Sequence, residues 1–207
     1  MRRRYAVMFL VVLAALISGG TTSIGSATAA ALLYPDLEPY PGTDFSIDQV
    51  AVDSNNPAAL TTVLRFSTLS WNQGDGPLQL WADGESGGKR SVYQEVLRSD
   101  GSGFTQLPTA AGDFAYHPAH AHFHFQDYAS YVLHRLDDPS LTGRHARGTK
   151  TTFCIMDTNR IDRKMPGAPK RSAYSSCGLD RQGMSVGWGD RYGASLWDQW
   201  VDLTDLL

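Results

Sequence analysis

Four of the six histidines of the chain lie close together in the stretch HPAHAHFHF, which begins at His117. Three of them, His120, His122 and His124, alternate with other residue types. Alternation places side chains on one face of a strand, whereas on a helix His122 would lie about 200° away from His120. The pattern therefore predicts a strand with three imidazoles on one face and the intervening phenylalanines in a core.

Three imidazoles are suitable ligands for Cu(II), Zn(II), Ni(II) or Fe(II), and the general order of affinities favours copper. On a flat strand the outer two Cα atoms would be about 13 Å apart, so this strand must bend or twist to bring three rings to one ion. Pro118, just upstream, is compatible with an irregular start. His117 lies off the alternation, and a role beside the metal or substrate and a plain turn position both stay open. The alternative to a metal site is a solvated or hydrogen-bonded stripe of histidines.

The elements that must position these histidines are predicted to be strands. TTVLRFSTLSW at 61–71 is rich in β-branched and aromatic residues, and LQLWA at 78–82 resumes after the turn NQGDGP. SVYQEVLR at 91–98 is a strand or a short helix, followed by the turn SDGSG. Turn signals recur about every 8–12 residues, as in a sandwich or barrel. We therefore expect a mainly β, sandwich-like core with few short helices and long irregular loops between 137 and 190.

The N-terminal segment, residues 1–29, is predicted to be a secretory signal peptide. Three arginines follow Met1, an apolar run comes next, and Ala27-Thr28-Ala29 offers a cleavage site. An uncleaved membrane anchor is the alternative, but the run is short for a span of about 20 residues. We expect residues 30–207 to form one secreted domain with no membrane attachment after cleavage.

The charge of the chain argues against nucleic acid as a partner. The formal net charge is −3 over the whole sequence, and loss of the three N-terminal arginines makes it −6. The two cysteines, Cys154 and Cys177, are an even number in a chain expected to be exported, so a disulfide is expected between them. Two free buried thiols are the alternative.

The histidine run resembles the H-x-x-H-x-H-x-H copper motif of the lysyl oxidase catalytic domain. Further stretches resemble motifs of the same family, and they follow one another in the same order. These stretches are LLYPDL at 32–37, VLRFSTLSWNQG at 63–74, KTTFCIMDT at 150–158 and QGMSVGWGDRYGASLWDQWVDLTD at 182–205. Together they cover most of the chain after the signal peptide.

The resemblance implies a copper amine oxidase that makes its own quinone cofactor. His120, His122 and His124 match the copper ligands, and Lys150 and Tyr192 match the pair that becomes lysine tyrosylquinone. Such an enzyme oxidises primary amines, including lysine side chains of proteins, to aldehydes with O2 and releases H2O2 and ammonia. Without the surrounding motifs, Lys150 would be interpreted as a solvated surface lysine and Tyr192 as a turn residue.

Several roles stay open on the sequence alone. Asp127 matches an acid of the family and is a candidate general base or a support for a metal ligand, and His117 is another candidate base. A non-catalytic secreted copper-binding module and a zinc hydrolase with three histidines are the competing functions. We also expect a Cys154–Cys177 bridge to fix the end of the loop that delivers Lys150 to Tyr192.

The sequence departs from the animal enzymes in ways that resemble a microbial short form. Ala119, Trp188 and Asp198 stand where those enzymes have further cysteines. The sequence ends at DLTDLL, whereas the family usually continues with more strands of the β core. We therefore expect the domain to lack its C-terminal strands, as a natural short form or as a fragment.

Overall fold

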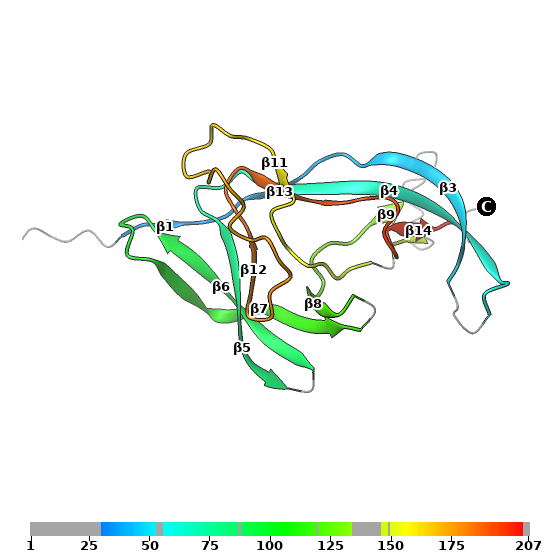
Figure 1. Ribbon diagram of the computed structural model, residues 1–207, viewed down its shortest axis with the longest axis horizontal. Helices are drawn as coiled ribbons and strands as arrows, with labels where there is room; N and C mark the ends of the chain where they lie inside the picture. The colour runs from blue at the N-terminus through cyan, green and yellow to red at the C-terminus, as the bar shows by residue number, and fades with distance from the viewer. Residues whose placement is uncertain are drawn as a thin grey trace, which may run out of the picture.

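The computed structural model describes residues 30–52, 56–86, 88–118, 120–133, 146–148 and 150–204 (Figure 1). These residues form two six-stranded antiparallel sheets and one short strand pair, which confirms the mainly β class. They contain no helix, so the few short helices expected from the sequence are not found there, and no helix of this part of the chain could span a membrane. The predicted signal peptide lies outside the described residues.

The first sheet carries the histidine run at its edge. Its strand order is β12-β5-β6-β7-β8, and β1 also pairs with β6. The bounds are β1 (Leu32–Leu33), β5 (Leu78–Ser86), β6 (Lys89–Arg98), β7 (Phe104–His117), β8 (His122–Phe125) and β12 (Arg181–Met184). The stretch 91–98 is therefore a strand and not a short helix.

The second sheet is built around one long strand, β4, and lies above the first sheet in the view of Figure 1. Its order is β11-β13-β4-β14, and β2 and β3 also pair with β4. The bounds are β2 (Leu37–Pro39), β3 (Thr43–Ala51), β4 (Leu60–Asn72), β11 (Asn159–Arg160), β13 (Trp188–Tyr192) and β14 (Trp200–Asp202). Separately, β9 (Val132–Leu133) pairs with β10 (Ala146–Arg147).

The region expected to be loops between 137 and 190 is only partly irregular. The strand β12 lies inside it and forms four residue pairs with β5, from Arg181 opposite Trp81 to Met184 opposite Leu78. The short strand β11 and the start of β13 also fall inside it. The described residues of this region are otherwise irregular, as in 161–180, which confirms the long irregular loops. Gln182 and Met184 are fully buried beside the first sheet, and their backbone completes its edge.

The two faces of β4 pack against two different apolar clusters. Val63 is buried with Val50 and Trp200 on one face of the strand. Phe66 packs with Val201 on the opposite face, where Leu64 joins them. The strand predicted at 61–71 from its β-branched and aromatic residues is thus confirmed, with side chains that point alternately to the two faces.

An irregular segment, residues 150–158, connects the two sheets. Phe153 exchanges backbone hydrogen bonds with Phe125 of β8, at 2.8 and 3.0 Å. Further along, the Thr158 amide donates to the carbonyl of Gly189 on β13 at 3.0 Å. This segment therefore lies against the histidine hairpin at one end and against the second sheet at the other.

Candidate metal centre

The histidines lie on a tight hairpin between β7 and β8. His117 ends β7 and is paired with His122, the first residue of β8. Ala121 has a φ of 56°, in the left-handed region, and reverses the chain just before the strand. Only His122 and His124 lie on the strand, so the prediction that all three alternating histidines share it is wrong for His120. On a flat strand the His120 and His124 rings would be too far apart to bind one ion. The turn brings the His120 ring close to that of His124.

Three imidazole nitrogens converge at this hairpin. The Nε2 atom of His124 lies 2.9 Å from Nε2 of His122 and 3.2 Å from Nδ1 of His120. Nitrogen ligands bound to one ion at about 2.0–2.1 Å are themselves about 3 Å apart. The spacing and the all-nitrogen donor set therefore fit a copper or zinc ion held by His120, His122 and His124.

The electrostatics keep these rings neutral. Burial, together with the positive charge of Lys150, lowers the pKa of His124 to about 3. Burial also lowers the pKa of His120 and that of His122. Because a metal binds the neutral imidazole, the three rings are in the ligand form at neutral pH.

Thr152 supports the central ligand, and its loss is expected to weaken metal binding. Its Oγ1 lies 3.2 Å from Nδ1 of His124, the nitrogen that does not face the other two rings. This contact fixes the orientation of the ring. We expect Thr152→Val to lower the Cu(II) affinity by about 10–100-fold in a titration against a competing chelator. Thr151→Val, one residue earlier, is the matched control, and equal affinities of the two variants would contradict this role.

His117 belongs to the same cluster. Its ring stacks on that of His120 with centroids 4.2 Å apart, and a nitrogen from each of His117, His120 and His124 lies within 4.8 Å of the others. His122 also lies near Cys154 and Cys177, but those sulfurs are bonded to each other and offer no thiolate ligand. His117 is therefore a member of the cluster and not an isolated turn residue.

A buried lysine and a tyrosine lie beside the histidines. Lys150 is only 6% exposed, which rules out the solvated surface lysine that the sequence alone suggests. Its Nζ lies 5.5 Å from the ring centroid of Tyr192 and 5.1 Å from that of Phe153. Tyr192 ends β13, packs edge-on against Phe153, and donates its hydroxyl hydrogen bond to the Cys154 carbonyl at 2.5 Å.

Burial changes the protonation of this pair. It lowers the pKa of the Lys150 amine, while the negative charge of Asp198 acts in the opposite direction. It raises the pKa of the Tyr192 phenol well above its ordinary value, and the charge of Asp190 raises it further. A neutral amine is the nucleophilic form of lysine, so burial favours the state in which Lys150 can form a covalent bond.

The expected disulfide is present and lies next to the lysine–tyrosine pair. Cys154 and Cys177 are bonded, with Cα atoms 5.3 Å apart. The carbonyl of Cys154 is the acceptor for the Tyr192 hydroxyl. The bridge therefore holds the backbone atom that orients the tyrosine.

Removal of both cysteines is expected to lower stability and the yield of any Lys150–Tyr192 link. A bridge across 23 residues contributes about 2–4 kcal/mol to the free energy of unfolding. Urea unfolding of the metal-free Cys154→Ser/Cys177→Ser variant measures this loss. A variant that folds, binds copper and still forms the full link would contradict a role of the bridge in positioning Lys150 and Tyr192.

The carboxylates of the site differ from the one expected. Asp127 is exposed, with a φ of 55°, on the turn after β8, and no interaction among the described residues joins it to the cluster. Two other acids, the buried Asp190 and the partly buried Asp198, interact electrostatically with the lysine–tyrosine pair. Burial raises the pKa of Asp198, which the charges of Lys150 and His117 oppose. Burial raises the pKa of Asp190 on β13 to about 7.

The sequence analysis gave neither Asp190 nor Asp198 a role. Asp198 was noted only as the replacement of a cysteine. Asp190 stands two residues before Tyr192, and on a strand this spacing places the two side chains on one face. This two-residue spacing was the signal in the sequence that could have placed Asp190 beside Tyr192.

The fold and the site define a mainly β protein with a histidine cluster beside a buried lysine–tyrosine pair. Comparison with known proteins agrees, because the sequence profile of the lysyl oxidase family matches residues 93–207. The chain belongs to the lysyl oxidase family.

Individual relatives match a shorter region. Human protein-lysine 6-oxidase is 37% identical over 91 residues, which are 44% of this chain and 20% of the human protein. The pig protein-lysine 6-oxidase has the same identity, over 33% of its length. Zebrafish lysyl oxidase homolog 3A is 34% identical over 94 residues, 45% of this chain and 11% of the relative. The matched region thus spans a third or less of each relative.

Proposed function

We propose that this protein is a secreted, copper-dependent amine oxidase. It converts primary amines to aldehydes with O2 and releases H2O2 and ammonia. The observation that carries the proposal is the position of the Lys150 amine, buried against the Tyr192 ring beside three converging imidazoles. Membership of the lysyl oxidase family supports it, and the disulfide is in keeping with an oxidising, extracellular location.

The residues that would hold the cofactors follow from the geometry. His120, His122 and His124 would bind copper, and Lys150 and Tyr192 would supply the two halves of lysine tyrosylquinone. When bound, copper and the quinone supply O2 activation and an electron sink for the amine.

The chain itself positions the reacting groups. The Cys154 carbonyl fixes the Tyr192 hydroxyl, and the edge-on contact with Phe153 fixes the plane of the ring. Phe153 is buried and its ring contacts both the Lys150 amine and the Tyr192 ring. Burial holds Lys150 closer to its neutral form, which is the form able to bond to the ring.

Proton removal from the substrate needs a base. Asp127 and His117 stay the candidates predicted from the sequence, and Asp198 is a partly buried carboxylate that the structure adds. Asp198 interacts electrostatically with Lys150, His117 and His120, so it is a third candidate base.

Peptide mass mapping tests the proposal directly. The protein is exposed to Cu(II) and air, digested, and searched for a covalent link between the peptides of Lys150 and Tyr192. We expect the linked peptide. Two separate, unmodified peptides in a folded, copper-loaded protein would overturn the oxidase and favour the non-catalytic copper-binding module. Visible absorption of the loaded protein tests the zinc hydrolase, since zinc sites are colourless.

A further inference from the structure

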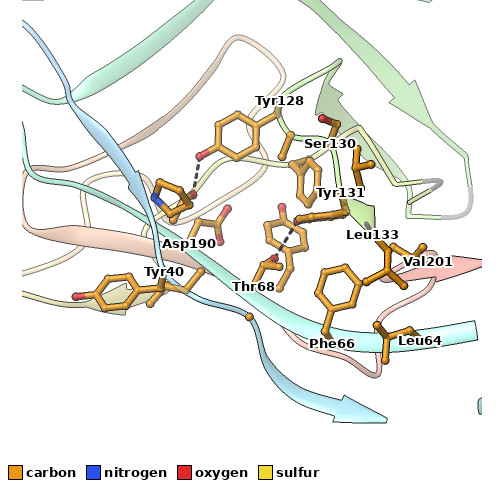
Figure 2. Close-up of a pocket in the computed structure, with 18 of the residues that line it drawn as sticks. Tyr40, Leu64, Phe66, Thr68, Tyr128, Ser130, Tyr131, Leu133, Asp190 and Val201 are labelled. Atoms are coloured by element: carbon orange, nitrogen blue, oxygen red, sulfur yellow. Dashed lines mark hydrogen bonds between the residues drawn. The ribbon is translucent and has the colours of Figure 1, made fainter. Parts of the chain in front are cut away.

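A cavity lies next to Tyr192, on the face of the second sheet where β4 and β13 pair (Figure 2). Its volume is about 630 Å³, and both Tyr192 and Asp190 line it. The two side chains share one face of β13 because they are two residues apart. Small-molecule sites typically enclose about 300–1,000 Å³, so the cavity has the size of a pocket for a small organic ligand.

The sheet gives this cavity a polar end and an apolar end. Side chains from one face of β4 line it and change from apolar to polar along the strand, in the order Leu64, Phe66, Thr68, Ser70. In the register of the sheet, Tyr192 is opposite Thr68 and Asp190 is opposite Ser70, so the acid and the tyrosine join the polar end. Figure 2 shows Asp190 and Tyr128 at one end and Phe66, Leu64, Leu133 and Val201 at the other.

Four hydroxyl groups of the polar end are paired with each other. Tyr128 and Ser70 share a hydrogen bond of 2.7 Å, and Tyr131 and Thr68 share one of 3.0 Å. Asp190 is the carboxylic acid that lines this end of the cavity. Phe66 and Val201, which are 7% and 2% exposed, line the opposite end.

The carboxyl group of Asp190 is buried and meets neutral hydrogen-bond donors. It is 3% exposed, the Met156 amide donates to it at 3.3 Å, and the hydroxyl groups of Thr158 and Tyr192 also lower its pKa by hydrogen bonding. Asp157, another buried acid, receives hydrogen bonds from the amides of Ala173, Tyr174 and Ser185 and from the Ser185 hydroxyl, at 2.7–3.2 Å. No lysine or arginine among the described residues forms an ion pair with Asp190. Its environment therefore suits a cationic partner that comes from outside the chain.

We propose that this cavity binds the substrate, and that the substrate is a primary amine on a compact apolar body, aromatic or branched aliphatic. The ammonium group pairs with Asp190, which places the carbon that bears it beside Tyr192, and the apolar body lies against Phe66, Leu64 and Val201. This inference deepens the proposed oxidase function and rests on it.

The apolar end favours such a body over a peptide. A peptide backbone placed against Phe66 and Val201 would lose hydrogen bonds to water without replacement, at a cost of about 1–3 kcal/mol for each unsatisfied group. An unbranched butylamine, the equivalent of a lysine side chain, would reach Asp190 but would leave much of the apolar end unfilled. An aromatic ring gains from burial of its full apolar surface.

Equilibrium binding to the copper-free full chain tests the proposal. The probes are 2-phenylethylamine, its neutral counterpart 2-phenylethanol, and n-butylamine, each titrated by calorimetry. We expect 2-phenylethylamine to bind at least about tenfold more tightly than either of the others, since only it offers both the charge and the ring. Methyl resonances of Leu64 and Val201 in NMR spectra should shift on binding, which locates the ligand.

Variants separate the two ends of the cavity. Asp190→Asn is nearly isosteric. It should lower the affinity for 2-phenylethylamine by at least about tenfold and leave that for 2-phenylethanol unchanged. Phe66→Leu should weaken both aromatic probes and spare n-butylamine. Asp100→Asn, an exposed acid in the β6–β7 turn, removes the same charge and should change nothing. Equal binding of amine and alcohol, or no effect of Asp190→Asn, would overturn the proposal.

The binding result is independent of the cofactor. If the Lys150–Tyr192 link forms and n-butylamine is oxidised as readily as 2-phenylethylamine, the oxidase stands and this choice of substrate is wrong. If no link forms but the amine still binds in an Asp190-dependent way, the oxidase fails and the cavity remains an amine-binding site.

Discussion

Replacement of Tyr192 by phenylalanine is expected to abolish amine oxidation while the protein stays folded and binds copper. The change removes the phenolic oxygen, without which the ring cannot become a quinone or bond to Lys150. We expect the rate of H2O2 release to fall by at least about 10³-fold, because all cofactor-dependent catalysis is lost. The copper content of the variant, measured in the same samples, should equal that of the parent protein.

The structural cost of this change is small. Phenylalanine keeps the edge-on contact with Phe153, whose ring centroid lies 4.6 Å from that of Tyr192. The hydrogen bond to the Cys154 carbonyl is lost, which costs about 1 kcal/mol. Tyr174→Phe is the matched control, since Tyr174 is also buried and donates one hydrogen bond, to Gln79. Oxidation at the parent rate by Tyr192→Phe would contradict the cofactor assignment.

Strands could be predicted from the sequence where the residue types of a single segment indicate which side chains are buried. The stretch 61–71 alternates between two clusters on opposite faces of β4, and its β-branched and aromatic residues are suited to that environment. The stretch 91–98 was ambiguous because eight residues of mixed polarity fit a short helix as well. The segment is a strand because it pairs with β5 and β7. Such pairing depends on other parts of the chain, so it cannot be predicted from the segment alone.

The histidine cluster could be predicted, but its geometry could not. Alternation correctly placed His122 and His124 on a strand. The reversal at Ala121 was hidden, since alanine rarely adopts a positive φ and gives no signal for it. The hairpin imposes that conformation because Phe123 and Phe125 must pack against the core of the first sheet.

The lysine–tyrosine pair depends on contacts between distant segments. Nothing in the neighbourhood of Lys150 marks it as buried, and its contact with Tyr192 forms only because residues 150–158 run between β8 and β13. The pairing of Lys150 with Tyr192 was predicted from the resemblance to a family, because residue propensities and spacing gave no indication of it. The environments of Asp190 and Asp198 also depend on distant segments. The sequence did not reveal them, because an acid taken alone is typical of a surface position.

Replacement of His124 by asparagine is expected to have the largest effect on the metal centre. Its Nε2 is the nitrogen that faces both His120 and His122, so its loss removes the central ligand. Structural metal sites with about four ligands have binding free energies of about 10–16 kcal/mol. Loss of one ligand should therefore lower the affinity for Cu(II) by at least about 10²-fold. Competition with a chelator measures the affinity, and electron paramagnetic resonance reports the loss of one coordinated nitrogen.

His117→Asn is the matched control within the same cluster, and it also decides which histidines are the ligands. If His120, His122 and His124 bind the ion, His122→Asn should lower the affinity for copper as much as His124→Asn does. His117→Asn should then cost about tenfold or less, as expected for a group that only supports a ligand. The opposite result, a large loss with His117→Asn and little with His122→Asn, would assign the ion to His117, His120 and His124, whose nitrogens also lie within 4.8 Å of one another. In that case β7, the turn and β8 would contribute one ligand each.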